Sequence, residues 1–130
     1  MTHKFKLLTG LLVAVMISGV AQAGQGPLQH LETYQQKGVD QVNQQQGQLL
    51  WNSTVNERSC TNCHGDNLEN AGKHLKTGKV IQPMAFSVNA ERYQDSKKIE
   101  KWFLRNCKWT FGRQCSTQEK ADILTWLSSQ

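Results

Sequence analysis

The sequence predicts an all-α fold in a single domain, and three observations support this. Apolar residues recur at helical spacing in three segments, and no segment alternates with a period of two residues. The stretch between Cys63 and Asp95 contains three glycines and a proline, so we expect a loop there and no sheet. A chain of 130 residues is long enough for one hydrophobic core.

Residues 1–23 are expected to be a signal peptide, which leaves residues 24–130 as the mature domain. The segment begins with Lys4 and Lys6, continues with an apolar run too short to span a bilayer comfortably, and ends in "AQA", a small-x-small cleavage pattern. An uncleaved membrane anchor is the alternative. Cleavage would lower the formal charge from +5 to +3 and place the protein in the periplasm. So mild an excess of positive charge does not indicate a nucleic-acid-binding protein.

Three helices are predicted. The first runs from about Val39 to Asn52. The second follows Asp95, a good N-cap, and covers residues 96–107. The third begins near Ser116, where "STQE" has the form of a capping box with Glu119.

The segment "CTNCHGD", residues 60–66, has the pattern of a c-type haem attachment site. In such a site the thiols of Cys60 and Cys63 bind the two vinyl groups of the haem, and His64 binds the iron. A thioredoxin-like CxxC would need a surrounding βαβ pattern, and a zinc site would need two further ligands nearby; neither is present. One such motif predicts one covalent haem c.

Two cysteines remain, Cys107 and Cys115. An exported protein lies in an oxidising compartment, where spare cysteines usually pair. A disulfide between them is therefore expected.

A helix, a CxxCH motif, a long loop and helices to the end of the chain resemble the class I cytochrome c fold, wrapped around one covalent haem. In that family a glycine and an aromatic residue four positions later lie on the N-terminal helix and pack against an aromatic residue of the C-terminal helix. The resemblance assigns these places to Gly47, Trp51 and Trp126. It also implies that the Pro83 carbonyl accepts a hydrogen bond from the Nδ1–H of the haem histidine.

Three residues compete for the sixth coordination position of the iron. Met84 is the usual choice in electron-transfer cytochromes, but it lies only 20 residues after His64 and directly after Pro83. His74 is closer still in sequence, and a surface position is the alternative reading. Asn106 lies 42 residues after His64, a suitable distance for the chain to wrap around a haem.

Asn106 is expected on the apolar face of the second helix, together with Ile99, Trp102 and Phe103. Burying an amide without a partner costs about 1–3 kcal/mol, so something should bond to it. A backbone carbonyl, a haem propionate and the iron itself are the possible partners.

The segments "IQPMAFSVNAERY", "KIEKWFLRNCKWTFGRQC" and "STQEKADILTWL" resemble the sphaeroides haem protein family of monohaem cytochromes c. The resemblance implies that Asn106 ligates ferric haem, leaves the iron on reduction and frees a site for O₂ and other small ligands. It also implies a Cys107–Cys115 disulfide beside that site, and a dihaem cytochrome c and a membrane cytochrome b as electron-transfer partners. Met84 stands where this family has leucine, so it stays open as a ligand.

The sequence therefore predicts a periplasmic haem protein that accepts an electron and then binds a diatomic ligand such as O₂ or NO. The candidate pocket residues are Trp102, Phe103, Trp109 and Phe111, and for each of them a plain core position is the alternative. A simple electron carrier with His64 and Met84 ligation is one alternative, and a small haem reductase or peroxidase is another. The segment "GKHLKTGK" is either a basic docking patch or a solvated loop.

Overall fold

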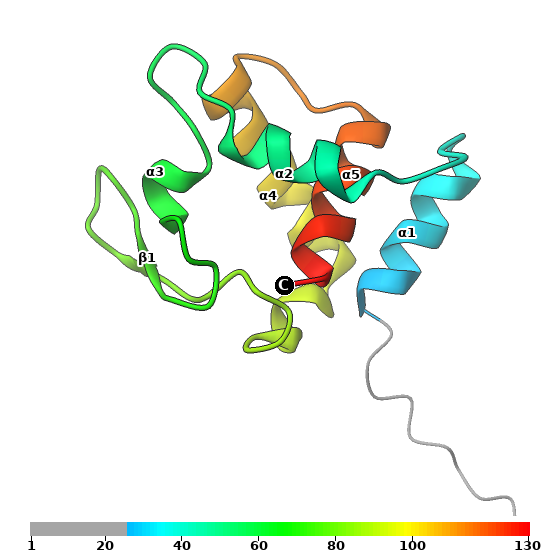
Figure 1. Ribbon diagram of the computed structural model, residues 1–130, viewed down its shortest axis with the longest axis horizontal. Helices are drawn as coiled ribbons and strands as arrows, with labels where there is room; N and C mark the ends of the chain where they lie inside the picture. Colours follow the sequence, from blue (N-terminus) through cyan, green and yellow to red (C-terminus); the bar gives the residue numbers. More distant parts are fainter. Residues whose placement is uncertain (1–25) are drawn as a thin grey trace, which may run out of the picture.

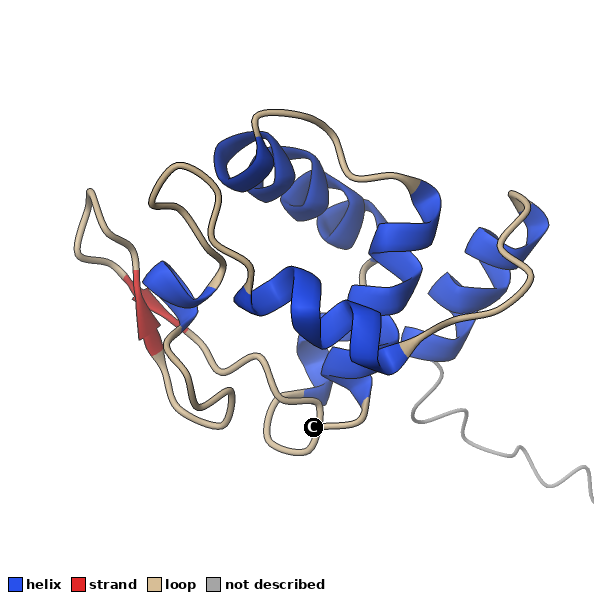
Figure 2. Cartoon of the chain, turned by 45° about the horizontal axis from the view of Figure 1, so that its top comes forward, coloured by secondary structure: helices blue, strands red, loops and turns tan. Residues whose placement is uncertain are grey.

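The computed structural model describes residues 26–130, apart from the side chain of Leu28, and the predicted signal peptide lies outside this range. The order of elements is α1 (Gly26–Gln36), α2 (Gln44–Asn52), α3 (Thr61–His64), β1 (Gly72–Lys73), β2 (Val80–Ile81), the 3₁₀ helix η1 (Ala90–Tyr93), α4 (Ser96–Phe111) and α5 (Thr117–Ser128). Helices dominate this part of the chain, as the all-α prediction requires (Figure 2). None of its helices is long and apolar enough to cross a membrane.

The core lies where α2 crosses α5, with α1 on one side of the crossing and α3 and the β strands on the other (Figure 1). Trp51 of α2 packs on Trp126 of α5, with the ring centroids 5.9 Å apart. The buried apolar cluster draws on every helix except the short α3, and on the loops at Val39, Leu68 and Ala85.

Gly47 makes the α2–α5 crossing possible. A Cβ atom at this position would overlap the backbone carbonyl of Asp122 and lie 2.9 Å from the backbone nitrogen of Ile123. The Asp122 side chain completes the contact, because its Oδ1 accepts a hydrogen bond of 2.8 Å from the backbone nitrogen of Asn43, the N-cap of α2. The close approach predicted for Gly47, Trp51 and Trp126 is present in the structure.

Two further helix starts agree with the sequence. Asp95 caps α4 by accepting from the backbone nitrogen of Lys98, and Ser116 forms the complete capping box with Glu119 at the start of α5. The predicted second helix continues beyond residue 107 to Phe111, because the first residue able to stop it is Gly112, which adopts φ +69°.

The first predicted helix was placed too early. α2 starts at Gln44, because the Asn43 side chain caps the backbone nitrogen of Gln46, while Val39 is buried in the core from the loop between α1 and α2. The helix α1 was not predicted at all. It is held by tertiary contacts that local periodicity does not show: buried Tyr34 donates a 2.6 Å hydrogen bond to Glu100, which also pairs with Lys120 at 2.7 Å.

The expectation of no sheet is also corrected, by a two-residue antiparallel ladder that pairs Gly72 with Ile81 and Lys73 with Val80. A ladder this short carries no recognisable alternation. It forms the base of a hairpin of residues 72–81.

Gly47→Ala is expected to destabilise the protein by about 3 kcal/mol, because backbone atoms that cannot rotate away must separate to admit the methyl group. Chemical denaturation measures the loss. The matched control is Gln48→Ala, an exposed position on the same helix, which should change the stability by less than about 0.5 kcal/mol. Equal stability of the two variants would show that the crossing is looser than the structure has it.

Candidate functional site

The CxxCH motif forms a single short turn. Cys60 is the N-cap of α3, Cys63 and His64 end the helix, and the backbone nitrogen of His64 bonds to the Cys60 carbonyl at 3.1 Å. Both cysteines are free thiols and half-buried. Two thiols and one imidazole thus arise from five consecutive residues, which is the donor set that covalent haem attachment requires.

His64 packs on the core through Trp51, with the ring centroids 5.0 Å apart. Burial, assisted by the positive charge of Arg92, lowers the pKa of His64 to about 4, so the imidazole is neutral at physiological pH. A neutral imidazole is the form that binds a metal. Trp51 therefore anchors the His64 ring to the core.

Two buried nitrogens at this point have no hydrogen-bond partner in the described part of the chain, His64 Nδ1 and Trp51 Nε1. Buried polar atoms are normally paired, and an unpaired one costs about 1–3 kcal/mol. Arg92 is half-buried beside them and takes part in neither ion pair of residues 26–130. Polar groups left unpaired beside two thiols fit a site built for a cofactor that carries charged and polar groups of its own.

The predicted hydrogen bond between His64 and Pro83 is not formed. The Pro83 carbonyl instead accepts a 3.0 Å bond from the Asn89 side chain. Asn89 lies just before η1 and ties the loop to this helix, so local contacts take the place of the bond implied by the class I resemblance.

Met84 and His74, two of the three candidate sixth ligands, lie in well-connected loops. The backbone nitrogen of Met84 bonds to the Leu68 carbonyl at 2.9 Å, its carbonyl accepts from Tyr93, and its side chain packs against the core. His74 is exposed in the hairpin, and its Nδ1 accepts a 3.2 Å bond from the backbone nitrogen of Thr77. His74 is thus a turn-forming surface residue in the structure.

Asn106, the third candidate, is exposed rather than buried. The face of α4 changes character along its length: Ile99 near the start is buried, while Trp102 is 43% exposed. Asn106 and Trp102 therefore lie on an exposed face of α4, while Cys107 and Thr110 of the same helix are buried.

Thr110 connects α4 to the CxxCH motif, and sequence reasoning missed it. It is buried, and its hydroxyl lies within hydrogen-bonding range of the Cys60 thiol, whose pKa burial raises to about 11. Asn106 precedes Thr110 by four residues, so it lies on the same side of the helix about 6 Å further along the axis. The spacing of four residues was the sequence signal that could have linked them.

Only some of the predicted pocket aromatics share this side of α4. Trp102 and Trp109 lie four residues before and three residues after Asn106, which are the spacings of neighbours on one helix face. Phe103 lies three residues before Asn106, so it shares this spacing, and it is partly buried against the core. Phe111 is five residues on and therefore about 140° around the helix, so the structure does not bring it to the candidate pocket.

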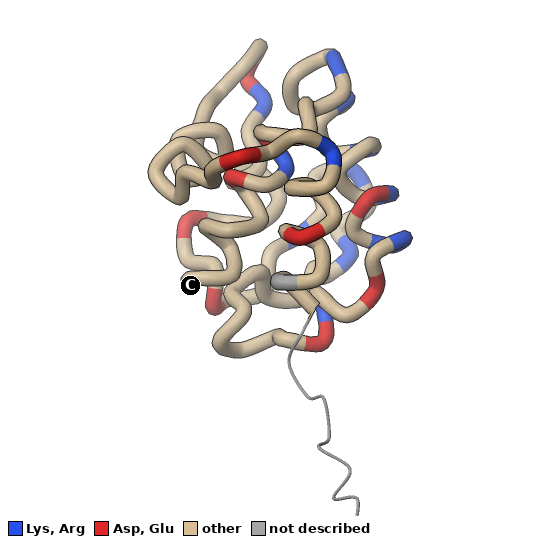
Figure 3. The backbone as a smooth tube through the Cα atoms, turned by 90° about the vertical axis from the view of Figure 1, so that its right-hand side faces the viewer, with Lys and Arg blue, Asp and Glu red and all other residues tan. Residues whose placement is uncertain are grey.

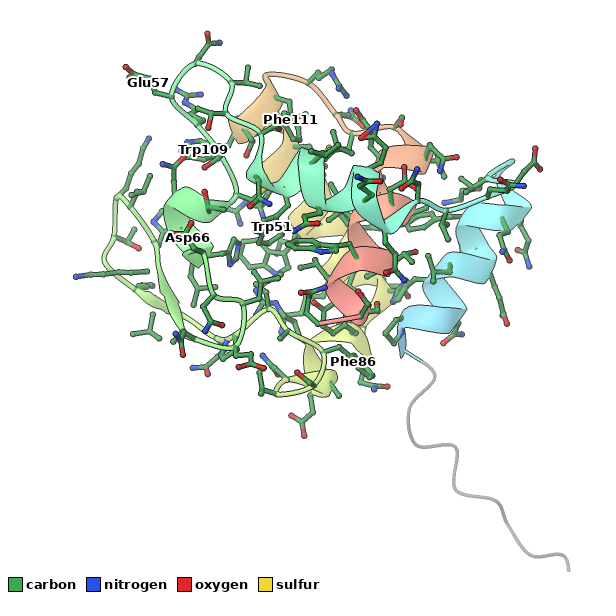
Figure 4. All side chains as sticks on the ribbon, in the orientation of Figure 1. Trp51, Glu57, Asp66, Phe86, Trp109 and Phe111 are labelled. Carbon is green, nitrogen blue, oxygen red and sulfur yellow. A yellow bond between two sulfur atoms is a disulfide. The ribbon has the colours of Figure 1, made fainter. Side chains whose placement is uncertain are left out.

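Arginines cover several of these aromatic rings. Arg105 lies over Trp102 at 5.3 Å, Arg113 lies over Phe111 at 5.7 Å, and Arg58 lies over Trp109 at 5.4 Å and donates to its carbonyl. Figure 4 shows Trp51 in the interior next to α3, and Trp109 and Phe111 near the end of α4, far from Phe86. The aromatic residues thus form separate groups rather than one pocket.

Cys107 and Cys115 form a disulfide in the structure, with their Cα atoms 5.6 Å apart. Both residues are buried, and the bridge joins α4 to the start of α5 across the intervening loop. Cys107 directly follows Asn106, so the bridge restrains the backbone of the candidate ligand.

Comparison with known proteins identifies relatives of this chain. Residues 37–127 match the model of a family described as Domain of unknown function (DUF1924). The chain is 37% identical over 126 residues to cytochrome c-type protein SHP of Cereibacter sphaeroides, an alignment covering 92% of this chain and 97% of that protein. It is also 39% identical over 74 residues to cytochrome c'' of Methylophilus methylotrophus, which covers 57% of this chain and 51% of that one.

The chain is also similar to solved structures of these two relatives. The chain matches oxidised SHP, described as an oxygen binding cytochrome c, with a TM-score of 0.73 and 38% identity over 80% of this chain and 96% of that one. It matches oxidised cytochrome c'' from Methylophilus methylotrophus with a TM-score of 0.72 and 27% identity over 83% of this chain and 97% of that one. The predicted class I-like cytochrome fold is therefore confirmed.

Replacing both Cys107 and Cys115 by serine is expected to lower the free energy of unfolding by about 2.5 kcal/mol, the chain-entropy value for so short a loop. Denaturation of the double variant measures the loss. Mass spectrometry after alkylation of the denatured, unreduced protein tests the bridge itself. Labelling of Cys107 and Cys115 without prior reduction would contradict it.

Proposed function

The chain belongs to the sphaeroides haem protein family of monohaem cytochromes c, and we propose that it is exported to the periplasm, carries one covalent haem, accepts an electron and then binds a diatomic ligand. The proposal rests on the family relationship and on residues that this chain places around the CxxCH turn. Haem supplies the redox and ligand-binding chemistry, and the protein supplies attachment, orientation and the choice of ligands.

The residues of this chain fit haem c. Cys60 and Cys63 present two thiols on one turn for the two vinyl groups, and His64 presents a neutral imidazole between them and Trp51. The positive charge of Arg92 acts on His64, and Arg92 has no ion-pair partner among residues 26–130. It would therefore be available to neutralise a haem carboxylate group. The Trp51 indole N–H is a second donor, and it is buried without an acceptor among residues 26–130.

The contact between Thr110 and Cys60 is the observation that carries the choice of Asn106. Cys60 would hold one vinyl group of the haem, and the buried Thr110 hydroxyl lies beside the Cys60 thiol. Asn106 lies one helical turn before Thr110 on the same side of α4. With haem held by Cys60, Cys63 and His64, Asn106 would be the α4 residue that supplies the second iron ligand.

A side-chain amide suits a ligand that must leave. It is a hard, neutral donor that ferric iron accepts, whereas ferrous iron prefers softer partners. Reduction would thus free one coordination position, with Trp102 and Trp109 beside it.

Asn106→Ala is expected to convert the ferric protein from six-coordinate to five-coordinate or water-bound haem, while the ferrous spectrum changes little. Asn106→His should give permanent bis-histidine ligation and slow CO binding by about 100-fold or more, because imidazole stays on ferrous iron. Optical and electron paramagnetic resonance spectra of both oxidation states provide the measurement.

Met84→Leu is the control for these variants, since it removes the competing ligand while preserving apolar volume. It should leave both spectra unchanged. Loss of a six-coordinate ferrous signal in this variant would instead favour an electron carrier with His64 and Met84 ligation.

Covalent attachment is tested separately. After acid–acetone extraction the haem is expected to remain with the polypeptide, because thioether bonds survive the treatment. Cys60→Ala and Cys63→Ala should each lower the yield of haem-bearing protein. Recovery of all the haem in the organic phase of the wild-type extract would contradict the attachment.

A further inference from the structure

The hairpin of residues 72–81 is an ordered projection that the haem site does not use. β1 and β2 pair at its base, and the turn is closed by backbone bonds from His74 to Lys79 and from Gly78 to His74, each 2.9 Å long. It stands out from the helical body beside α3 (Figure 1). A turn with this many internal bonds holds its surface residues in fixed places.

The hairpin is uniformly basic. Between Asn70 and Ala90 the chain has Lys73, Lys76 and Lys79 and no acidic residue. All three lysines are exposed, and none takes part in an ion pair within residues 26–130. On the α1 side of the molecule, in contrast, basic and acidic residues are mixed (Figure 3). The positive charge of the hairpin is therefore local and unbalanced.

Two large apolar side chains are exposed among these lysines. Leu75 is 57% exposed and Val80 is 68% exposed, and neither belongs to the buried core. Exposed apolar groups within a ring of like charges are a usual composition for a surface that meets another protein transiently. The charges attract a partner of opposite sign and the apolar groups give the contact its area.

The base of the hairpin touches the haem-binding turn directly. A Cβ at Gly72 would overlap the Cys63 carbonyl and lie 2.8 Å from the Cα atom of His64, so only glycine allows β1 to lie this close. A protein seated on the hairpin would therefore be adjacent to the residues that hold the haem.

We propose that the hairpin of residues 72–81 is the docking surface for an acidic electron-transfer protein, which binds through carboxylates to Lys73, Lys76 and Lys79 around Leu75 and Val80. This proposal depends on the proposed haem function, because the electron from the partner needs a haem in this chain to accept it. The complementary charge of the partner follows from three unpaired cations with no acidic residue among them.

The test is stopped-flow reduction of the ferric holoprotein by a reduced flavodoxin, used as an acidic protein donor. The triple variant Lys73→Gln, Lys76→Gln, Lys79→Gln is compared with Lys97→Gln, Lys98→Gln, Lys101→Gln, which removes the same charge from exposed positions of α4. At low ionic strength the hairpin variant should react about 10-fold more slowly than the wild type and the α4 variant less than about 3-fold more slowly. The difference should disappear at about 1 M salt.

Equal slowing of the two triple variants would overturn the proposal, since it would show an effect of net charge alone; so would no slowing of the hairpin variant. Replacing Leu75 and Val80 by serine should slow the reaction without changing its dependence on salt. Excess dithionite should reduce all variants to completion. A wild-type protein that takes up haem but cannot be reduced by dithionite would overturn the proposed function, which separates that failure from a failure of docking.

Discussion

The close crossing of α2 and α5 at Gly47 and Asp122 is the constraint on which the rest of the structure depends. It brings Trp51 between Trp126 and His64, so the helix crossing and the orientation of the imidazole are parts of one packed unit. The Asp122 carboxylate adds to this by bonding to the N-cap of α2. Any residue larger than glycine at position 47 would push α2 away from α5. α2 carries Trp51, on which the His64 ring packs.

The two sides of the candidate haem site differ in how firmly they are held. The side of Trp51 is buried and joined to the main core. On the α4 side, Thr110 is buried against Cys60, while Asn106 and Trp102 one and two turns earlier are exposed. In the proposed function, His64 is the iron ligand on the Trp51 side and Asn106 is the ligand on the α4 side. The Cys107–Cys115 bridge ties α4 to the start of α5 directly after Asn106.

Local chemistry made much of this predictable from sequence. The CxxCH turn, the caps at Asp95 and Ser116 and the small residue at position 47 each depend on a few neighbouring residues, and the structure contains all of them. The features that were missed depend on distant contacts. α1 exists through Tyr34 and its bond to Glu100, 66 residues away, and α2 begins late because Asn43 is held by Asp122.

The central claim is that reduction opens the iron on the α4 side, and the kinetics of CO binding to the reduced holoprotein test it most directly. We predict that the observed rate rises linearly with CO concentration over the whole accessible range, because no protein ligand has to leave first. A rate that levels off at a value independent of CO, or a reduced protein that does not bind CO, would show that a protein ligand stays on ferrous iron and would contradict the account.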